Sequence, residues 1–281
     1  MEEKIDLHTH TSASDGTYSP GDLVRYAREN GLTALAITDH DTVDGITEAV
    51  ARGSQYGVRI IPGIEFSIDY PGGTFHLLGY YLDYKNKNLI WECRRLTRMR
   101  ETRAYRIIDD LEKNSIKIPR ADIEKDAKKG PIGRPHIARL LVKYRYAKNT
   151  NEVFENYLVK GKPGYVKKDR IDLDLAVSLI KDAGGIPVIA HPITLDFEDF
   201  GDFEDILRDC ARSGISGVEV YSYMHSPGQI EAFSRISEKL DMIITGGSDF
   251  HGDKVQKIGN YSDNNAIPPE LLIKMDRKVL K

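Results

Sequence analysis

Ile5-Asp6-Leu7-His8-Thr9-His10 is a short apolar run that ends in two histidines, and its pattern recurs along the chain. Metal-type ligands also follow apolar runs at Thr38-Asp39-His40-Asp41 and at Ser248-Asp249-Phe250-His251. In parallel α/β folds the loops at the carboxyl ends of the strands converge on one rim, so we expect these segments to meet. Four further ligand-type side chains lie outside these segments, three of them at or near the end of an apolar run: Asp15, Glu65, His76 and His191.

The mixture of side chains predicts a site for more than one metal ion. Residues i and i+2 of a strand point the same way, so His8 and His10 can reach one cluster together, as can Asp249 and His251. Six histidines and three carboxylates exceed the four ligands of a single zinc site. Imidazole mixed with carboxylate suits Zn, Mn or Fe, whereas Ca and Mg prefer oxygen ligands. The predicted metal ligands are His8, His10, Asp15, His40, Glu65, His76, His191, Asp249 and His251.

Composition limits the class of protein. The chain has 281 residues, of which 40% are hydrophobic, enough for one large α/β domain with an insertion. Its formal net charge of -3 gives no global field that would recruit nucleic acid or membrane. Cys93 and Cys210 form no C-x-x-C pair and are expected to be reduced thiols. Without a signal-like N-terminus or a membrane-length apolar run, we expect a cytoplasmic protein with no membrane association and no stable protein partner.

Two patterns of secondary structure alternate along the chain. Residues 1–85 and 169–281 read as strands alternating with helices, whereas 86–168 is polar, helical and almost free of strands. Ser19 and Pro20 are typical of a helix start, and Gly31 of its end. Short strand–helix–strand connections imply parallel pairing. We therefore expect a barrel-like α/β domain interrupted by a helical insertion.

The ordered motifs resemble those of the PHP (polymerase and histidinol phosphatase) superfamily of metal-dependent phosphoesterases, across the whole chain except the insertion. The resemblance implies a distorted (β/α)7 barrel around a trinuclear metal centre of two to three divalent ions (Mn, Fe or Zn). Asp15 stands where many members have a histidine. The implied ligand sets are His8, His10, Glu65 and Asp249 for one ion, Asp15, His40 and His251 for a second, and Glu65, His76 and His191 for a third.

Adjacent divalent ions suit hydrolysis of phosphate esters. They lower the pKa of a bridging water, so that metal-bound hydroxide can attack phosphorus at pH 7, and they polarise the phosphoryl oxygens. Amide hydrolysis at a binuclear site is a chemical alternative that the spacing leaves open.

The insertion contains a second candidate element, Gly133-Arg134-Pro135-His136. An arginine at a helix N-terminus is either an anion site or part of an ordinary capped helix. The motif resembles one in the PHP subgroup of nucleoside 3′,5′-bisphosphate phosphatases and 5′-3′ exoribonucleases. That resemblance implies a lid-like insertion in which Arg134 orients the phosphate. His136 and His225 would assist the leaving group or hold a second phosphate, although His225 also reads as a simple loop histidine.

We therefore predict a metal-dependent phosphoesterase acting on nucleoside mono- or 3′,5′-bisphosphates or on the 5′ ends of short RNA. Two alternatives remain open. The first is a small-metabolite phosphatase of the histidinol-phosphate type, against which the insertion argues. The second is a non-catalytic, metal-stabilised module that serves a replication or repair partner.

Overall fold

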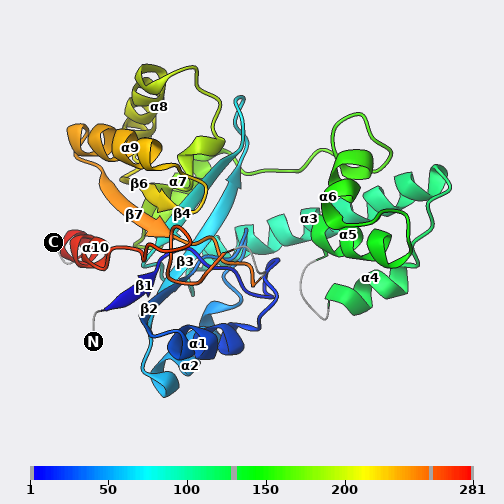
Figure 1. Ribbon diagram of the computed structural model, residues 1–281, viewed down its shortest axis with the longest axis horizontal. Coiled ribbons are helices and arrows are strands. Elements are labelled where there is room, and N and C mark those ends of the chain that lie inside the picture. The colour runs from blue at the N-terminus through cyan, green and yellow to red at the C-terminus, as the bar shows by residue number, and fades with distance from the viewer. Residues whose placement is uncertain (1–2, 128–131, 253–255, 280–281) are drawn as a thin grey trace. The chain divides into compact units, whose positions relative to one another are not determined.

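The computed structural model of the chain describes residues 3–127, 132–252 and 256–279 (Figure 1). The chain divides into two compact units. The first, which we call the barrel unit, comprises Met1–Cys93 and Arg170–Lys281, and the second, the helical unit, comprises Arg94–Asp169.

Seven strands of the barrel unit form one nearly closed sheet in which each strand pairs with its neighbours in chain order, β1 to β7. Pairing is parallel throughout except around β4, which is antiparallel to both β3 and β5. The expected (β/α)7 barrel is therefore confirmed. The strands are β1 (Lys4–Asp6), β2 (Leu32–Ile37), β3 (Arg59–Ile68), β4 (Phe75–Tyr80), β5 (Ile186–Ile189), β6 (Gly217–Ser222) and β7 (Ile243–Gly247).

The reversed β4 corrects one expectation from the sequence. His76 was expected at or near the end of an apolar run, but it is the second residue of β4 and pairs with Ser67 of β3. Since β4 runs against its neighbours, its beginning lies at the rim where the parallel strands end. Parallel pairing, expected from strand–helix–strand connections, does not apply to β4 because no helix separates it from β3.

Helices pack around the sheet of the barrel unit. In α1, the side chain of Ser19 accepts a hydrogen bond from the Asp22 amide (3.1 Å), Pro20 is the first helical residue, and Gly31 follows the helix with φ +82°. The predicted start and end signals thus operate as expected. The helices are α1 (Pro20–Glu29), α2 (Ile46–Tyr56), α7 (Leu173–Asp182), the 3₁₀ turn η2 (Pro192–Thr194), α8 (Phe200–Arg212), α9 (Pro227–Lys239) and α10 (Glu270–Val279).

A buried carboxylate joins the first and last strands of the barrel. Asp6, at the end of β1, accepts hydrogen bonds from the amide and hydroxyl of Ser248 (3.0 and 2.5 Å) and from the amide of Gly259 (2.7 Å). One backbone bridge, between Thr9 and Phe250, lies beside it. Side-chain hydrogen bonds therefore hold together the two chain segments that carry His8, His10, Asp249 and His251.

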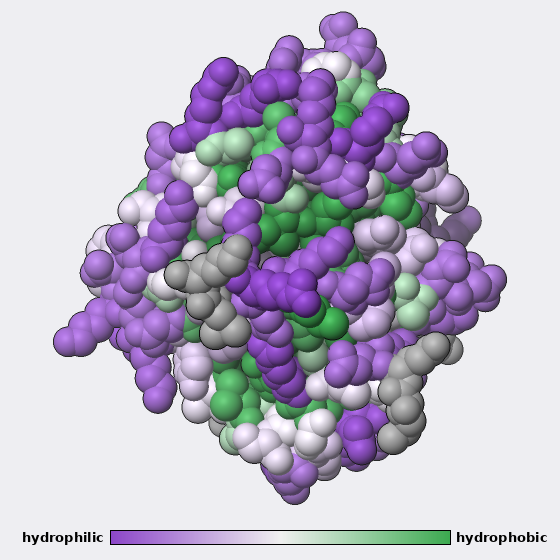
Figure 2. Space-filling view, turned by 90° about the vertical axis from the view of Figure 1, so that its left-hand side faces the viewer, coloured by the Kyte–Doolittle hydropathy of each residue, from purple (hydrophilic) through white to green (hydrophobic). Residues whose placement is uncertain are grey.

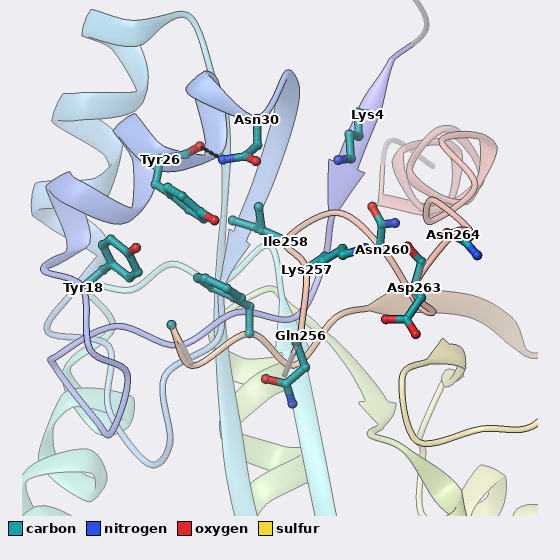
Figure 3. A pocket seen from close by; sticks show the side chains of 12 residues that line it. Lys4, Tyr18, Tyr26, Asn30, Gln256, Lys257, Ile258, Asn260, Asp263 and Asn264 are labelled. Carbon is teal, nitrogen blue, oxygen red and sulfur yellow. Dashed lines mark hydrogen bonds between the residues drawn. The ribbon is translucent and has the colours of Figure 1, made fainter. Parts of the chain in front are cut away.

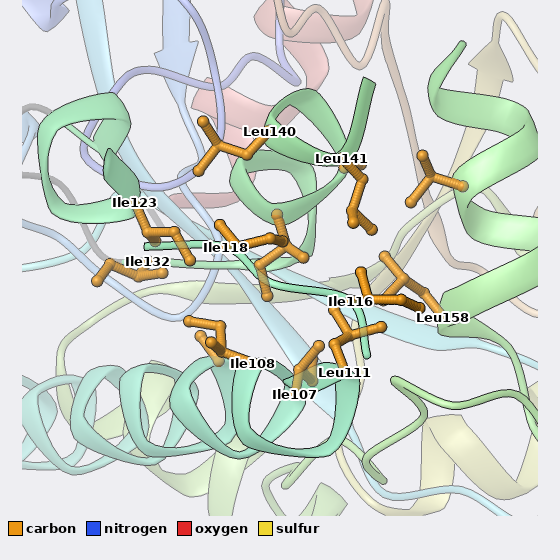
Figure 4. Close-up of a cluster of buried hydrophobic side chains, with 14 residues drawn as sticks. Ile107, Ile108, Leu111, Ile116, Ile118, Ile123, Ile132, Leu140, Leu141 and Leu158 are labelled. Atoms are coloured by element: carbon orange, nitrogen blue, oxygen red, sulfur yellow. The ribbon is translucent and has the colours of Figure 1, made fainter. Parts of the chain in front are cut away.

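The helical unit has its own hydrophobic core (Figure 4). Leucine and isoleucine side chains of the long first helix, such as Ile107 and Leu111, face Ile137 and Leu141 of a later helix and are fully buried. No strand occurs among the residues of this unit that the structure describes. The helices are α3 (Lys87–Lys113), which begins in the barrel unit, α4 (Arg120–Ala127), α5 (Arg134–Lys143), α6 (Thr150–Val153) and the π-helical turn η1 (Phe154–Leu158).

Among the described residues, no helix is both long and apolar enough to cross a bilayer. Figure 2 shows hydrophilic residues over most of one face, with hydrophobic ones in the recesses between them. Cys93 and Cys210 are both buried and unpaired, in agreement with the expectation of free thiols.

Candidate metal centre

All nine predicted ligands lie together at one end of the barrel unit, although they come from six strands and the loops that follow them. His8 and His10 follow β1, His40 follows β2, and His191 follows β5. Glu65 lies within β3, where its carboxylate is fully buried. The barrel thus brings together side chains that are up to 243 residues apart in the sequence, from His8 to His251.

Glu65 is the centre of this cluster. Its carboxylate lies 2.8 Å from His40 Nδ1, 2.9 Å from His76 Nδ1 and 3.1 Å from His191 Nε2. His8 Nε2 and His10 Nε2 are each 3.4 Å away. Five imidazoles therefore converge on one carboxylate, and this mixture of nitrogen and oxygen donors would suit divalent transition metals.

The donor atoms form three groups, each compact enough for one ion. The first is the set that the family resemblance implied. The second group is the implied set with His10 added. The third group contains His40 in place of the implied His191, which instead contacts Glu65 directly. The three groups are His8, His10, Glu65 and Asp249; His10, Asp15, His40 and His251; and His40, Glu65 and His76.

Several donor atoms in the cluster are buried and have no hydrogen-bond partner in the part of the chain that the structure describes. An unpaired buried polar atom costs about 1–3 kcal/mol, and a bound cation would satisfy several such atoms that face one another. Nitrogen and carboxylate donors together are the ligands that divalent transition metals prefer, and the residues therefore fit a divalent metal centre. The atoms are His8 Nε2, His10 Nδ1, His40 Nδ1, Glu65 Oε2 and His76 Nδ1.

The pKa shifts within the cluster run in both directions: burial opposes a charge on His8 and His191, but the nearby carboxylates Glu219 and Glu65 raise the pKa of these two imidazoles. Burial, with His251 nearby, lowers the pKa of His10 to about 3, and burial lowers the pKa of His76 to about 4. Burial disfavours ionisation of Glu65, but the imidazoles of His40 and His76 hold the pKa of this carboxyl well below its usual range. Neutral imidazoles and an ionised carboxylate are the forms that bind divalent cations.

Asp15 lies in the outermost group. Its carboxylate is 3.5 Å from His251 Nε2 and 4.0 Å from both His10 Nδ1 and His40 Nε2. Burial opposes a charge on His251, but the hydrogen bond to Asp15 raises the pKa of His251 to about 10. Asp15 therefore belongs to the group of donor atoms formed with His10, His40 and His251.

Glu219 is a buried residue of this site that the sequence analysis missed. One carboxylate oxygen accepts a hydrogen bond from His8 Nδ1 (2.9 Å) and the other accepts one from the His191 amide (2.8 Å). With Nδ1 as the donor, the Nε2 lone pair of His8 faces the cluster and can bind a cation. A lone glutamate inside the apolar strand Gly217–Ser222 was the available signal.

Asp39 and Asp41 fix loops and belong to none of the three groups of donor atoms. Asp39 accepts hydrogen bonds from the amide and hydroxyl of Thr11 (2.7 and 2.8 Å) and from the Ser14 hydroxyl (2.6 Å). It therefore holds the loop that leads to Asp15. Asp41 accepts a hydrogen bond from the Ser67 amide (3.0 Å).

His225 lies just after β6 and is buried against Phe233, with the two rings 4.9 Å apart. Its Nδ1 donates to the carbonyl oxygen of Val220 (2.7 Å), and its buried Nε2 has no partner among the described residues. Burial lowers the pKa of this histidine, so the ring is neutral at pH 7. It belongs to none of the metal groups but offers one free lone pair.

Arg134 and His136 lie in the helical unit, at the beginning of α5. The Arg134 guanidinium stacks on the ring of Phe154 at 5.6 Å. His136 is buried, and its Nδ1 accepts a hydrogen bond from the Gly133 amide (3.1 Å). His136 therefore caps the helix through Nδ1, a role that the sequence analysis did not assign, and only its Nε2 could contact a substrate.

Positive charges gather around this helix start. Burial, together with the charges of Arg134 and Arg100, lowers the pKa of Arg103 to about 10. A Cβ atom at Gly133 would lie 3.0 Å from Arg100 Nε, so the glycine lets the backbone approach that guanidinium closely. Three arginines near a helix N-terminus make a site suited to an anion.

Comparison with known proteins agrees with this chemistry. The family model described as "PHP domain" matches residues 6–165. A 5′-3′ exoribonuclease of Haemophilus influenzae is 35% identical over 89% of this chain and 91% of its own length. A 3′,5′-nucleoside bisphosphate phosphatase of Chromobacterium violaceum is 31% identical over 99% of this chain and 98% of its own length. A Bifidobacterium adolescentis protein described as a metal-dependent phosphoesterase superposes with a TM-score of 0.86 at 28% identity, covering 100% of this chain and 96% of its own.

Proposed function

Because the chain belongs to the PHP domain family, we propose that it is a metal-dependent phosphoesterase that hydrolyses phosphate esters of nucleotides. The substrates would be nucleoside mono- or 3′,5′-bisphosphates, or the 5′ ends of short RNA. One observation carries the proposal: all nine ligand-type side chains are present in one cluster, and five of its imidazoles converge on Glu65. The names of the exoribonuclease and of the bisphosphate phosphatase described above support nucleotides as the substrate class.

Two to three divalent ions, of Mn, Fe or Zn, would be held by the three groups of donor atoms around Glu65. When bound, such ions activate water as a nucleophile and neutralise phosphoryl charge. Two side chains that would not bind the ions also have roles in this proposal. Glu219 keeps the Nε2 lone pair of His8 directed at the cluster, and neutral His225 accepts a hydrogen bond from the substrate through Nε2.

The arginines at the start of α5 would bind an anionic group of the substrate. Arg134, Arg100 and Arg103 repel one another, and a phosphate oxygen would relieve that repulsion while accepting charge-assisted hydrogen bonds. In this proposal Arg134 orients the phosphate, and His136 Nε2 is a further donor or acceptor beside it.

The proposal is tested by measuring product release from four substrates in the presence of Mn²⁺. These are a nucleoside 3′,5′-bisphosphate, 5′-AMP, a short 5′-phosphorylated RNA and histidinol phosphate, with inorganic phosphate or mononucleotide as the product detected. We expect the highest kcat/KM for the bisphosphate or the RNA. A preference for histidinol phosphate would identify a small-metabolite phosphatase instead, and inactivity on all four substrates with metal bound would indicate a non-catalytic module.

Replacing Arg134 by alanine should lower kcat/KM for the preferred substrate by roughly 30-fold, equivalent to about 2 kcal/mol for the loss of charge-assisted phosphate contacts. Steady-state kinetics measures the effect, and the melting temperature shows whether α5 survives the loss of the contact with Phe154. Arg139→Ala is the matched control, because Arg139 lies in the same helix but pairs with Asp126 at 2.8 Å. An unchanged kcat/KM in Arg134→Ala would show that this arginine does not contact the substrate.

A further inference from the structure

A groove of about 750 Å³ lies on the barrel unit between α1 and the segment that follows β7 (Figure 3). It plays no part in the function proposed above. Its lining combines aromatic rings, amides and lysines, three kinds of group that bind nucleotides. The rings and charged or amide groups at its centre belong to Lys4, Tyr18, Tyr26, Phe250, Lys257 and Asn260.

Three nearly parallel aromatic rings form one wall of the groove. The ring of Tyr26 lies 5.1 Å from that of Tyr18, with 19° between their planes, and 5.6 Å from that of Phe250, with 12° between planes. Phe250 is buried, whereas both tyrosines are partly exposed. The two partly exposed tyrosines therefore lie against the buried ring of Phe250. Such an aromatic surface can stack with the planar ring of any nucleobase.

Polar groups line the rest of the groove. Among the lining residues that the structure describes, Lys4 and Lys257 carry positive charges and Asp263 carries the one carboxylate, which already accepts a hydrogen bond from the Tyr223 hydroxyl. Lys257 Nζ donates to the backbone carbonyl of Asp263 (3.0 Å), which places its ammonium group at the groove. Amide side chains, which can donate to and accept from base edges, come from Asn30, Gln256, Asn260 and Asn264.

The groove begins beside the metal centre. Phe250 lies in the chain between the two ligand residues Asp249 and His251, and Gly252, the next residue, lines the groove. The amide of Thr17 donates to the carbonyl oxygen of His251 (2.8 Å), so the loop that carries Asp15 also delivers Tyr18. Residues 249–252 therefore carry two predicted ligands of the metal centre and also contribute Phe250 and Gly252 to the groove, so the two sites share one short stretch of chain.

We propose that this groove binds a nucleotide of an RNA substrate other than the one whose phosphate ester is cleaved, with its base on the tyrosines and its phosphate near the lysines. The inference rests on the proposed function. A nucleoside bisphosphate has only one nucleoside and does not need the groove, whereas an oligonucleotide extends beyond the cleaved ester and does. The groove thus sets the preference between RNA and mononucleotides.

The test uses two single variants of the full chain, Tyr26→Leu and Lys257→Gln. Leucine keeps an apolar contact with Phe250 but removes the stacking face, and glutamine removes the charge. kcat/KM is measured for a 5′-phosphorylated pentaribonucleotide and for a nucleoside 3′,5′-bisphosphate. We expect each variant to lower the RNA value by roughly tenfold and to leave the bisphosphate value within about twofold of wild type.

Tyr84→Leu and Lys85→Gln are matched controls, because Lys85 lies over the ring of Tyr84 outside the groove. Equal effects of the groove variants on both substrates, or no effect on either, would overturn the inference. Binding of fluorescent RNA to wild type and Tyr26→Leu separates this question from the function itself. If the wild type hydrolyses neither substrate, the proposed function fails. Even then, a tenfold weaker affinity of Tyr26→Leu than of the wild type for the RNA would support binding in the groove, and an equal affinity would refute it.

Discussion

Glu65→Gln is expected to lower kcat/KM by on the order of 10³-fold or more and to reduce the amount of metal that the protein retains. This carboxylate is fully buried and lies within 3.4 Å of five imidazole nitrogens. It belongs to two of the three groups of donor atoms. A neutral amide of the same shape removes the negative charge that these two groups share, so the substitution should weaken both of them.

Metal content after dialysis, kcat/KM and the melting temperature measure this effect together. Glu48→Gln is the control, since Glu48 is an exposed glutamate of the same unit that accepts one hydrogen bond, from the Gly21 amide (3.0 Å). Glu219→Gln should give an intermediate result, about 10–100-fold weaker metal affinity, because Glu219 orients His8 rather than contacting the ion. Wild-type metal content and activity in Glu65→Gln would remove Glu65 from the centre.

Much of the barrel and of its ligand set could be predicted because their signals are local. Apolar runs that end in histidine or aspartate mark the carboxyl ends of β1, β2 and β7, and parallel topology then places those ends on one rim. Capping signals such as Ser19 and Gly31 act within a single helical turn and need no knowledge of the rest of the fold.

What could not be predicted depends on contacts between distant segments. The direction of β4 is set by its pairing with β3 and β5, and the sequence of Phe75–Tyr80 contains nothing that reports it. Glu219 reads as an isolated charge until the fold places it against His8, which is 211 residues away. The groove likewise joins α1 to the segment after β7, so its aromatic wall exists only once the barrel has formed.

In the helical insertion, too, some features of the motif at residues 133–136 could be predicted from the sequence and others could not. A helix beginning at Arg134 and an arginine beside a helix N-terminus follow from neighbouring residues, and both are observed. The proximity of Arg100 and Arg103 to this helix start depends on how α3 packs beside α5, which the sequence does not encode at short range, whereas the capping bond of His136 to the Gly133 amide is local and was simply missed.

Removal of divalent ions with a chelator should abolish hydrolysis and also lower the melting temperature. The barrel buries the carboxylates of Glu65, Asp249 and Glu219 close to one another, and without cations their repulsion and the unpaired imidazole nitrogens oppose folding. A ligand present at 1,000 times its Kd stabilises the folded state by about 4 kcal/mol, which for a chain of this length corresponds to several degrees.

Calorimetry and the four-substrate assay, before chelation and after re-addition of Mn²⁺, Fe²⁺ or Zn²⁺, measure both effects. Chelator already saturated with metal is one control. Glu65→Gln is the other, because a protein that has lost the shared carboxylate should show little further loss of stability. Enzymatic function requires that activity and melting temperature recover together. Recovery of the melting temperature without hydrolysis would leave a folded, metal-stabilised module, since the same nine side chains can hold ions without turning over a substrate.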